Sequence, residues 1–389
     1  MAGKLQRLSH ALRSGIAVAM LTVATFAAAQ GLRGDHPDTY VVQRGDTLWD
    51  IAGRFLQKPW LWPEIWQANP QIANPHLIYP GDVISLAYLN RVGVTPGPRV
   101  DAAPINAVPL SEVEPFLKDL RVVDGFDHMP HVVGLEEDRL RSSRGQVVYV
   151  RGLQGTPGAR YAVLRPTVRY THLLRAGLCC DVFSRDDLDQ TGRRTLDFGK
   201  YWANVVMPDK GQEVLGYELM RVAAGTLTRG EVGGIQASTL LLDEEGREVR
   251  IGDRVVPVDA RAYDLQFFPH PPKVQTDYGK ARVLAVADMY TAGGPRDVVA
   301  LSVGAREGVD NGTVFSIWRE GSNVVDRVEK GLDRDEDTVF FENKVRLPDE
   351  FAGHVMVFRT FDRVSYGLVM DSVKPTRVGY HLKHPDATY

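Results

Sequence analysis

The stretch from Tyr40 to Leu86 constrains the fold of this chain more than any other. Residues 40–43 alternate as a short strand does, and a Gly45-Asp46 turn follows. The next apolar residues, Leu48, Ile51, Ala52 and Phe55, have the spacing of one helical face. Asp46 stands where an N-cap carboxylate accepts free backbone N–H groups, so a helix is expected to begin near Asp46 or Thr47.

A second helix is predicted over residues 63–68, because proline suits the first helical position and the Asn69-Pro70 pair ends a helix. Residues 77–86 then contain a Pro-Gly turn and an alternating strand that can pair antiparallel with residues 40–43. The predicted order is strand, helix, helix, strand.

These residues resemble the LysM family. The resemblance rests on Tyr40-Val41-Val42, Gly45-Asp46-Thr47-Leu48, Ile51-Ala52, Ala68-Asn69-Pro70 and Leu77-Ile78-Tyr79-Pro80-Gly81-Asp82, in the family's order and at nearly its spacing. It implies a βααβ module over residues 38–89 that binds polymers containing N-acetylglucosamine, meaning peptidoglycan in bacteria and chitin elsewhere.

The resemblance also implies a shallow groove between the loop entering the first helix and the loop leaving the second. Its glycan-binding residues here would be Gly45, Asp46, Thr47, Leu48, Leu77, Ile78, Tyr79 and Pro80. Each also has a structural interpretation, as turn glycine, helix cap or core residue. Four nearby tryptophans leave two alternatives open, a sugar-stacking surface or the core of the module: Trp49, Trp60, Trp62 and Trp66.

The N-terminus has the pattern of a secretory signal peptide over residues 1–29. Lys4, Arg7 and Arg13 precede an apolar run that ends in three alanines before Gln30. The run is short for a membrane span, although an uncleaved anchor stays open as an alternative. The prediction is an exported, wall-associated protein in the periplasm of a Gram-negative bacterium, with no membrane span in the mature chain.

Charge and cysteine content exclude some classes of protein. The net charge is −3, and loss of the three positive charges in residues 1–29 makes it −6. An acidic chain is a poor partner for nucleic acid, whose phosphates require clustered Lys and Arg. The only cysteines, Cys179 and Cys180, are neighbours, so either free thiols or a strained vicinal disulfide is expected.

The remainder predicts mainly β structure, so the whole chain is assigned to the α+β class. A Pro-rich linker is expected over residues 90–113, then a first β domain (114–268) that opens with a helix over residues 114–120, and a second β domain (277–389), each of barrel or sandwich type. A glycine followed by polar residues and an apolar strand recurs at residues 145–148, 252–256, 312–315 and 379–382. This weak repeat suggests related small β units.

No catalytic pattern of a wall enzyme is present in the sequence. The pairs His128/His131 and His381/His384 have metal-compatible spacing, but isolated pairs of this kind are interpreted as surface or turn histidines, so no metal and no cofactor are predicted. The predicted function is non-catalytic binding of peptidoglycan in the cell envelope. The alternatives are a scaffold or assembly component of an envelope complex, with a protein partner for the β domains, and, third, a wall hydrolase or its regulator.

Overall fold

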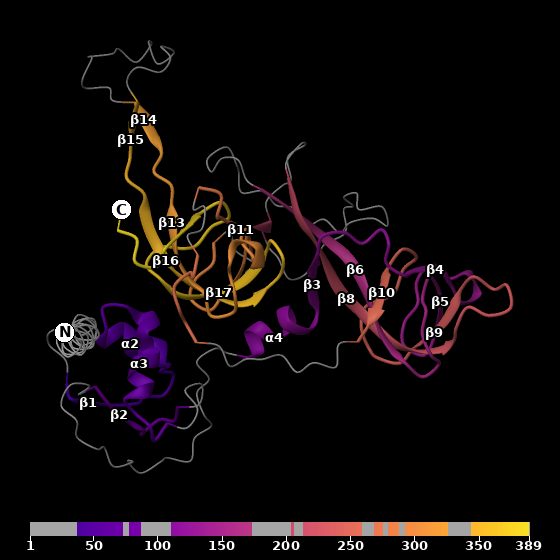
Figure 1. Cartoon of the computed structure of the whole chain (residues 1–389), viewed down its shortest axis with the longest axis horizontal. Helices are drawn as coiled ribbons and strands as arrows, with labels where there is room; N and C mark the ends of the chain where they lie inside the picture. The colour runs from indigo at the N-terminus through magenta and orange to yellow at the C-terminus, as the bar shows by residue number, and fades with distance from the viewer. Residues whose placement is uncertain are drawn as a thin grey trace, which may run out of the picture. The chain divides into compact units, whose positions relative to one another are not determined.

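The computed structural model describes residues 37–72, 78–86, 110–172, 204–205, 213–258, 268–274, 279–287, 292–325 and 344–388 (Figure 1). The chain divides into two compact units, here called the N-terminal module (residues 1–108) and the C-terminal region (109–389). The predicted signal peptide, most of the predicted linker, Leu77, Cys179 and Cys180 lie outside the described residues.

The N-terminal module has the predicted order of elements. Its elements are β1 (Thr39–Val41), α2 (Leu48–Phe55), a 3-10 turn η1 (Pro59–Leu61), α3 (Trp62–Gln67) and β2 (Val83–Ser85). Strands β1 and β2 pair antiparallel, with Tyr40 opposite Ile84. The apolar face of α2 is buried, because Leu48, Ile51 and Ala52 are inaccessible to solvent.

The tryptophans serve mainly as core. Trp49, Trp60 and Trp62 are buried. Trp60 belongs to η1, which connects α2 to α3 along the chain. Trp66 is half-buried, and its indole N–H donates to the carbonyl of Ile72 at 2.7 Å. A small module fills its interior with large rings, and the sugar-stacking interpretation loses three of its four side chains.

Asn69 joins the end of α3 to β2. Its buried amide donates to the carbonyls of Ile65 and Ser85 at 2.7 and 2.9 Å. Its carbonyl oxygen accepts the backbone N–H of Ser85 at 2.7 Å and the side chain of Gln71 at 2.9 Å. The amide therefore satisfies backbone groups of both a helix end and a strand.

The C-terminal region opens with helix α4 (Leu110–Lys118) and strand β3 (Leu120–Val123). The helix begins four residues before the predicted start and has Pro115 in its interior, not near its beginning. The predicted helical end at Leu120 is wrong, because Leu120 pairs with Met220 as the first residue of β3. Pairing with β8 thus makes Leu120 part of a strand, although the local sequence pattern predicts a helix there.

A first β unit follows, with a short 3-10 turn η2 (Glu136–Asp138). Its strands are β4 (His131–Leu135), β5 (Val147–Arg151), β6 (Arg160–Thr171), β8 (Val214–Arg229), β9 (Ser238–Leu242) and β10 (Arg254–Pro257). They pair in the order β8-β6-β10-β4-β5-β9, β9 pairs back with β8, and β3 adds to the other side of β8. The six strands from β8 to β9 therefore form a closed ring of pairings.

A second β unit contains a 3-10 turn η3 (Ala305–Glu307). Its strands are β11 (Val283–Val286), β12 (Val298–Leu301), β13 (Val314–Arg319), β16 (Glu350–Thr360), β17 (Ser365–Ser372) and β18 (His381–Lys383). They pair in the order β18-β13-β16-β17-β12-β11, and a bridge from Arg282 to His381 brings the first strand beside the last. Strand β7 (Asn204–Val205) pairs with β11, while β14 (Asn323–Val325) and β15 (Lys344–Arg346) form a separate ribbon.

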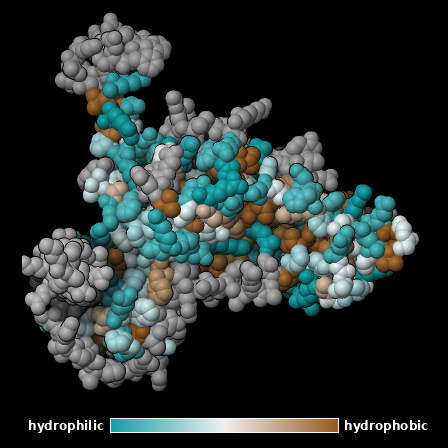
Figure 2. Space-filling model, viewed as in Figure 1, coloured by the Kyte–Doolittle hydropathy of each residue, from teal (hydrophilic) through white to brown (hydrophobic). Residues whose placement is uncertain are grey.

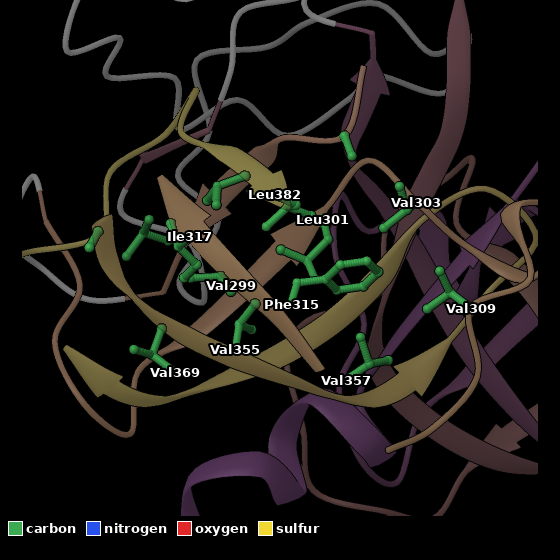
Figure 3. Packing of buried hydrophobic residues seen from close by; sticks show 14 residues of the cluster. Val299, Leu301, Val303, Val309, Phe315, Ile317, Val355, Val357, Val369 and Leu382 are labelled. Atoms are coloured by element: carbon green, nitrogen blue, oxygen red, sulfur yellow. The ribbon is translucent and has the colours of Figure 1, made fainter. Parts of the chain in front are cut away.

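The second unit has a continuous apolar core. Figure 3 shows side chains from several strands pointing toward one another, among them Val299, Leu301, Phe315, Ile317 and Val355. All five are fully buried. Burial of this set is the main source of stability for the unit.

The two β units share one strand order. With the six strands of each ring numbered along the chain, both rings run 1-2-5-4-3-6 and close between 6 and 1. The turns agree as well. Gly252 N–H donates to Val132 O, and Gly379 N–H donates to Val283 O, both at 2.8 Å, so the glycine phrases at 252–256 and 379–382 occupy the same place in their units.

A buried carboxylate connects the two β units. Glu218 of β8 accepts hydrogen bonds from the hydroxyls of Tyr170 and Tyr366, both at 2.7 Å, and from Thr167 at 2.8 Å. Tyr366 belongs to β17 of the second unit, while the others belong to the first. Burial raises the pKa of both tyrosines well above its ordinary value, and the charge of Glu218 adds to this effect.

The division into separate domains at residues 268–277 stays a prediction.

Candidate glycan-binding site

The two predicted loops lie at the same end of the β1–β2 sheet. Residues 43–47 follow β1, and residues 78–82 precede β2. Val42 connects them, because its N–H donates to the carbonyl of Asp82 and its carbonyl accepts the N–H of Gly81, both at 2.9 Å. The antiparallel pairing of β1 with β2 thus brings together residues distant in sequence.

Asp46 fixes the first loop through its buried side chain. One carboxylate oxygen accepts the backbone N–H of Gln43 at 2.8 Å and the hydroxyl of Tyr40 at 2.7 Å. The other accepts the guanidinium of Arg54 at 2.9 Å. Burial and the hydrogen bond to Asp46 raise the pKa of the Tyr40 phenol, although Arg54 opposes the shift.

The expected capping role of Asp46 is therefore wrong, and Thr47 is the N-cap of α2. The Thr47 hydroxyl accepts the N–H of Asp50 at 3.1 Å, and the Asp50 carboxylate accepts the N–H of Thr47 at 3.1 Å. This is a capping box. Asp46 lies one residue too early and instead binds the strand, its own turn and the last turn of α2.

The second loop is held by Asp82. Its carboxylate accepts the N–H of Tyr79 at 3.0 Å, and its N–H donates to the Tyr79 carbonyl at 3.0 Å. Gly81 has φ +96°, which only glycine adopts without strain. Ile78 is buried, whereas Tyr79 and Pro80 are half-buried and present part of their side chains to solvent.

The predicted site residues therefore divide into two groups. Gly45 is exposed, with φ +95° and no atom within 4 Å of where a Cβ would stand, and with Tyr79 and Pro80 it forms the accessible group. The side chains of Asp46, Thr47, Leu48 and Ile78 are buried and shape the loops from beneath.

Sequence reasoning missed Tyr40 and Arg54 as supports of the first loop and Asp82 as the support of the second. A carboxylate three residues after Tyr79 in a Pro-Gly turn is a recognisable signal of such support. The contact of Arg54 with Asp46, eight residues apart across a strand-to-helix turn, has no local signature.

Comparison with known proteins identifies this module. Residues 40–87 match the LysM domain family. Residues 40–87 of the N-terminal module form a LysM domain. The chain is also similar to the uncharacterized protein YqbP of Bacillus subtilis (strain 168), with 38% identity over 60 residues. That match covers 13% of this chain and 27% of the Bacillus protein, so the chain spans about a quarter of that relative.

The histidine pairs make ordinary structural contacts. His131 Nδ1 lies 3.3 Å from the carbonyl of Met129, and His381 Nε2 lies 2.9 Å from the carboxylate of Glu320. Among the described residues, no group of three His, Cys, Asp or Glu side chains is placed to hold a metal ion. No helix within the same ranges has the length and hydropathy needed to cross a bilayer.

The different roles of Asp46 and Thr47 predict different losses of stability. Thr47→Ala removes a cap and should lower the free energy of unfolding of the LysM domain by about 0.5–2 kcal/mol. Asp46→Ala leaves the Gln43 N–H and the Tyr40 hydroxyl without their acceptor, and about 1.5–3 kcal/mol is expected. Urea denaturation followed by tryptophan fluorescence measures both. A smaller loss for Asp46→Ala than for Thr47→Ala would contradict this assignment.

Proposed function

We propose that this protein binds the N-acetylglucosamine-containing glycan of peptidoglycan through the two loops of its LysM domain. The family match over residues 40–87 is the observation that carries the proposal. The placement of both loops at one end of the sheet supports it, since Val42 bonds to the second loop and precedes the first.

The chemistry of the loops suits an N-acetyl group, which has one N–H, one carbonyl and one methyl. Gly45 leaves the backbone of the first loop open to a ligand, because no side chain covers it. Tyr79 and Pro80 offer half-buried apolar surface in the second loop. No ionic contact is required, so recognition relies on backbone polar groups and ring faces.

Tyr79→Ala should weaken retention on insoluble peptidoglycan about fivefold or more, because it removes apolar contact worth about 1 kcal/mol or more. Cosedimentation of the full chain with purified sacculi measures the effect, and circular dichroism checks that the variant is folded. A matched control is Val41→Ala, which removes an exposed apolar side chain from β1 outside both loops. Equal sedimentation of Tyr79→Ala and wild type would move the site elsewhere.

The wider proposal is a non-catalytic protein of the cell envelope, exported to the periplasm of a Gram-negative cell and associated with the wall. The pattern of residues 1–29 supports export. The closed ring of strand pairings in each β unit supports a barrel type for both units. Incubation with peptidoglycan should release no new muropeptides, and release that disappears on changing one acidic residue would establish a hydrolase.

A scaffold role is the second candidate, in which the LysM domain localises the C-terminal region and the β units contact envelope proteins. The exposed apolar side chains of the β units favour it, among them Tyr149, Val324 and Val345. Proteins crosslinked to the β units in intact cells would identify such partners.

A further inference from the structure

The contact between the two β units uses a two-stranded arm of the first unit. Strands β6 and β8 continue beyond their ring as residues 165–171 and 214–221, here called the first arm. Tyr170 and Glu218 of this arm meet Tyr366 on the outer face of β17. Phe116 of α4 packs on the same tyrosine, with ring centroids 6.0 Å apart. The outer face of the second unit is therefore covered.

The equivalent face of the first unit is open. Tyr366 pairs with Ala300 in the second unit, and the equivalent pair in the first is Thr239 with Tyr149. The first strand of each unit carries a bulge at the same place, at Val133 of β4 and at Leu284 of β11. Tyr149 and Val133 are 36% and 39% exposed, whereas Ala300, Leu284 and Tyr366 are inaccessible. We call the outer surface of β4, β5 and β9 the open face.

The second unit carries an arm of its own. The β14–β15 ribbon continues β13 and β16 beyond the second ring, as Figure 1 shows. Val324 lies ten residues after Val314, as Tyr170 lies ten residues after its equivalent, Arg160. The ribbon pairs Val324 with Val345, which are 40% and 48% exposed, and Leu347 beside them is 42% exposed.

The chain thus contains two arms and two outer faces of this kind. The first arm covers the outer face of the second unit, whereas the open face and the β14–β15 ribbon remain exposed. A two-stranded ribbon that exposes three large apolar side chains is marginal in water and gains from a packing partner. Figure 2 shows hydrophobic residues on the β14–β15 ribbon. The ribbon and the open face both expose apolar side chains. The first arm and the outer face of β17 instead meet through the Tyr170–Glu218–Tyr366 hydrogen bonds.

We propose that the occupant of the open face is the β14–β15 ribbon of a second copy of this chain. The contact is head to tail, because each copy offers a ribbon from its second unit and an open face on its first. Such a contact builds rings or linear chains and not an isologous dimer. Several LysM domains would then be carried by one assembly.

Sedimentation velocity of the full chain over a range of concentrations tests the proposal. Val324→Glu places a charge on the ribbon, and Tyr149→Glu places one on the open face. Either change should raise the dissociation constant about tenfold or more, since burying an unpaired carboxylate is strongly unfavourable. Val373→Glu is the matched control, because Val373 is exposed after β17, outside both surfaces, and should associate as wild type does.

Mixing the two variants separates a head-to-tail contact from any other kind. At a concentration near the wild-type dissociation constant, each variant alone should be mostly monomeric, because one half of its contact is disrupted. An equimolar mixture should form a dimer and nothing larger, since one intact ribbon meets one intact open face. A wild type that stays monomeric up to about 1 mM, variants that associate as wild type does, or a mixture without dimer would each overturn the proposal.

Discussion

Asn69→Ala should unfold the LysM domain and abolish retention on peptidoglycan. The substitution leaves the Ser85 N–H and the carbonyls of Ile65 and Ser85 without the partner they have inside the module. Each buried polar group left unsatisfied costs about 1–3 kcal/mol. A domain of this size has only a few kcal/mol of stability, on the order of 0.05–0.15 kcal/mol per residue, so the loss equals most of it.

Tryptophan fluorescence during urea denaturation follows this change, because Trp49, Trp60 and Trp62 lie in the core of the domain. Gln71→Ala is the control: it removes the partly buried donor to Asn69 and should lower stability by about 1 kcal/mol only. An Asn69→Ala variant that melts with wild type and still sediments with sacculi would show that the amide is dispensable.

Glu218→Ala should destabilise the C-terminal region by about 3 kcal/mol or more. The buried hydroxyls of Tyr170 and Tyr366 lose their carboxylate acceptor, and Thr167 keeps only its longer, 3.4 Å contact with the Glu218 carbonyl. For a region of this length the melting temperature should fall by roughly 6–12 °C.

Calorimetry of the full chain measures that shift, and the LysM domain transition should stay in place. Glu248→Ala is the matched control, since this glutamate is half exposed, pairs with Arg141 on the surface and should change stability by about 0.5 kcal/mol or less. A melting temperature for Glu218→Ala equal to that of the control would mean that the carboxylate does not hold the two β units together.

Local signals predicted the LysM domain well because its elements are specified by short patterns. The helical face at Leu48, Ile51 and Ala52 and the Pro-Gly turn at residues 80–81 each depend on neighbours within a few residues. The capping residue was misassigned by one position, because both Asp46 and Thr47 are good caps. The reciprocal Thr47–Asp50 pair selects Thr47, while Asp46 binds Arg54.

The C-terminal region was predicted only as strands bracketed by turns, because its order depends on pairing between distant residues. Strand β6 pairs with β8 across a separation in sequence that no pattern encodes. The recurring glycine phrase indicated related units, yet only two of its four occurrences hold equivalent positions. Buried Glu218 resembles any surface glutamate in sequence, so its link to Tyr366 had no local signal.

Binding of the glycan by the two loops of the LysM domain can be located residue by residue in a backbone amide titration. A soluble tetramer of N-acetylglucosamine would be added to the isotope-labelled protein and amide shifts followed by NMR. Shifts should concentrate at residues 43–47 and 78–82, around Gly45 and Tyr79, and Tyr79→Ala should need at least about fivefold more tetramer to produce them. Shifts confined to other parts of the chain, or none at up to about 1 mM tetramer, would show that these two loops do not hold the glycan.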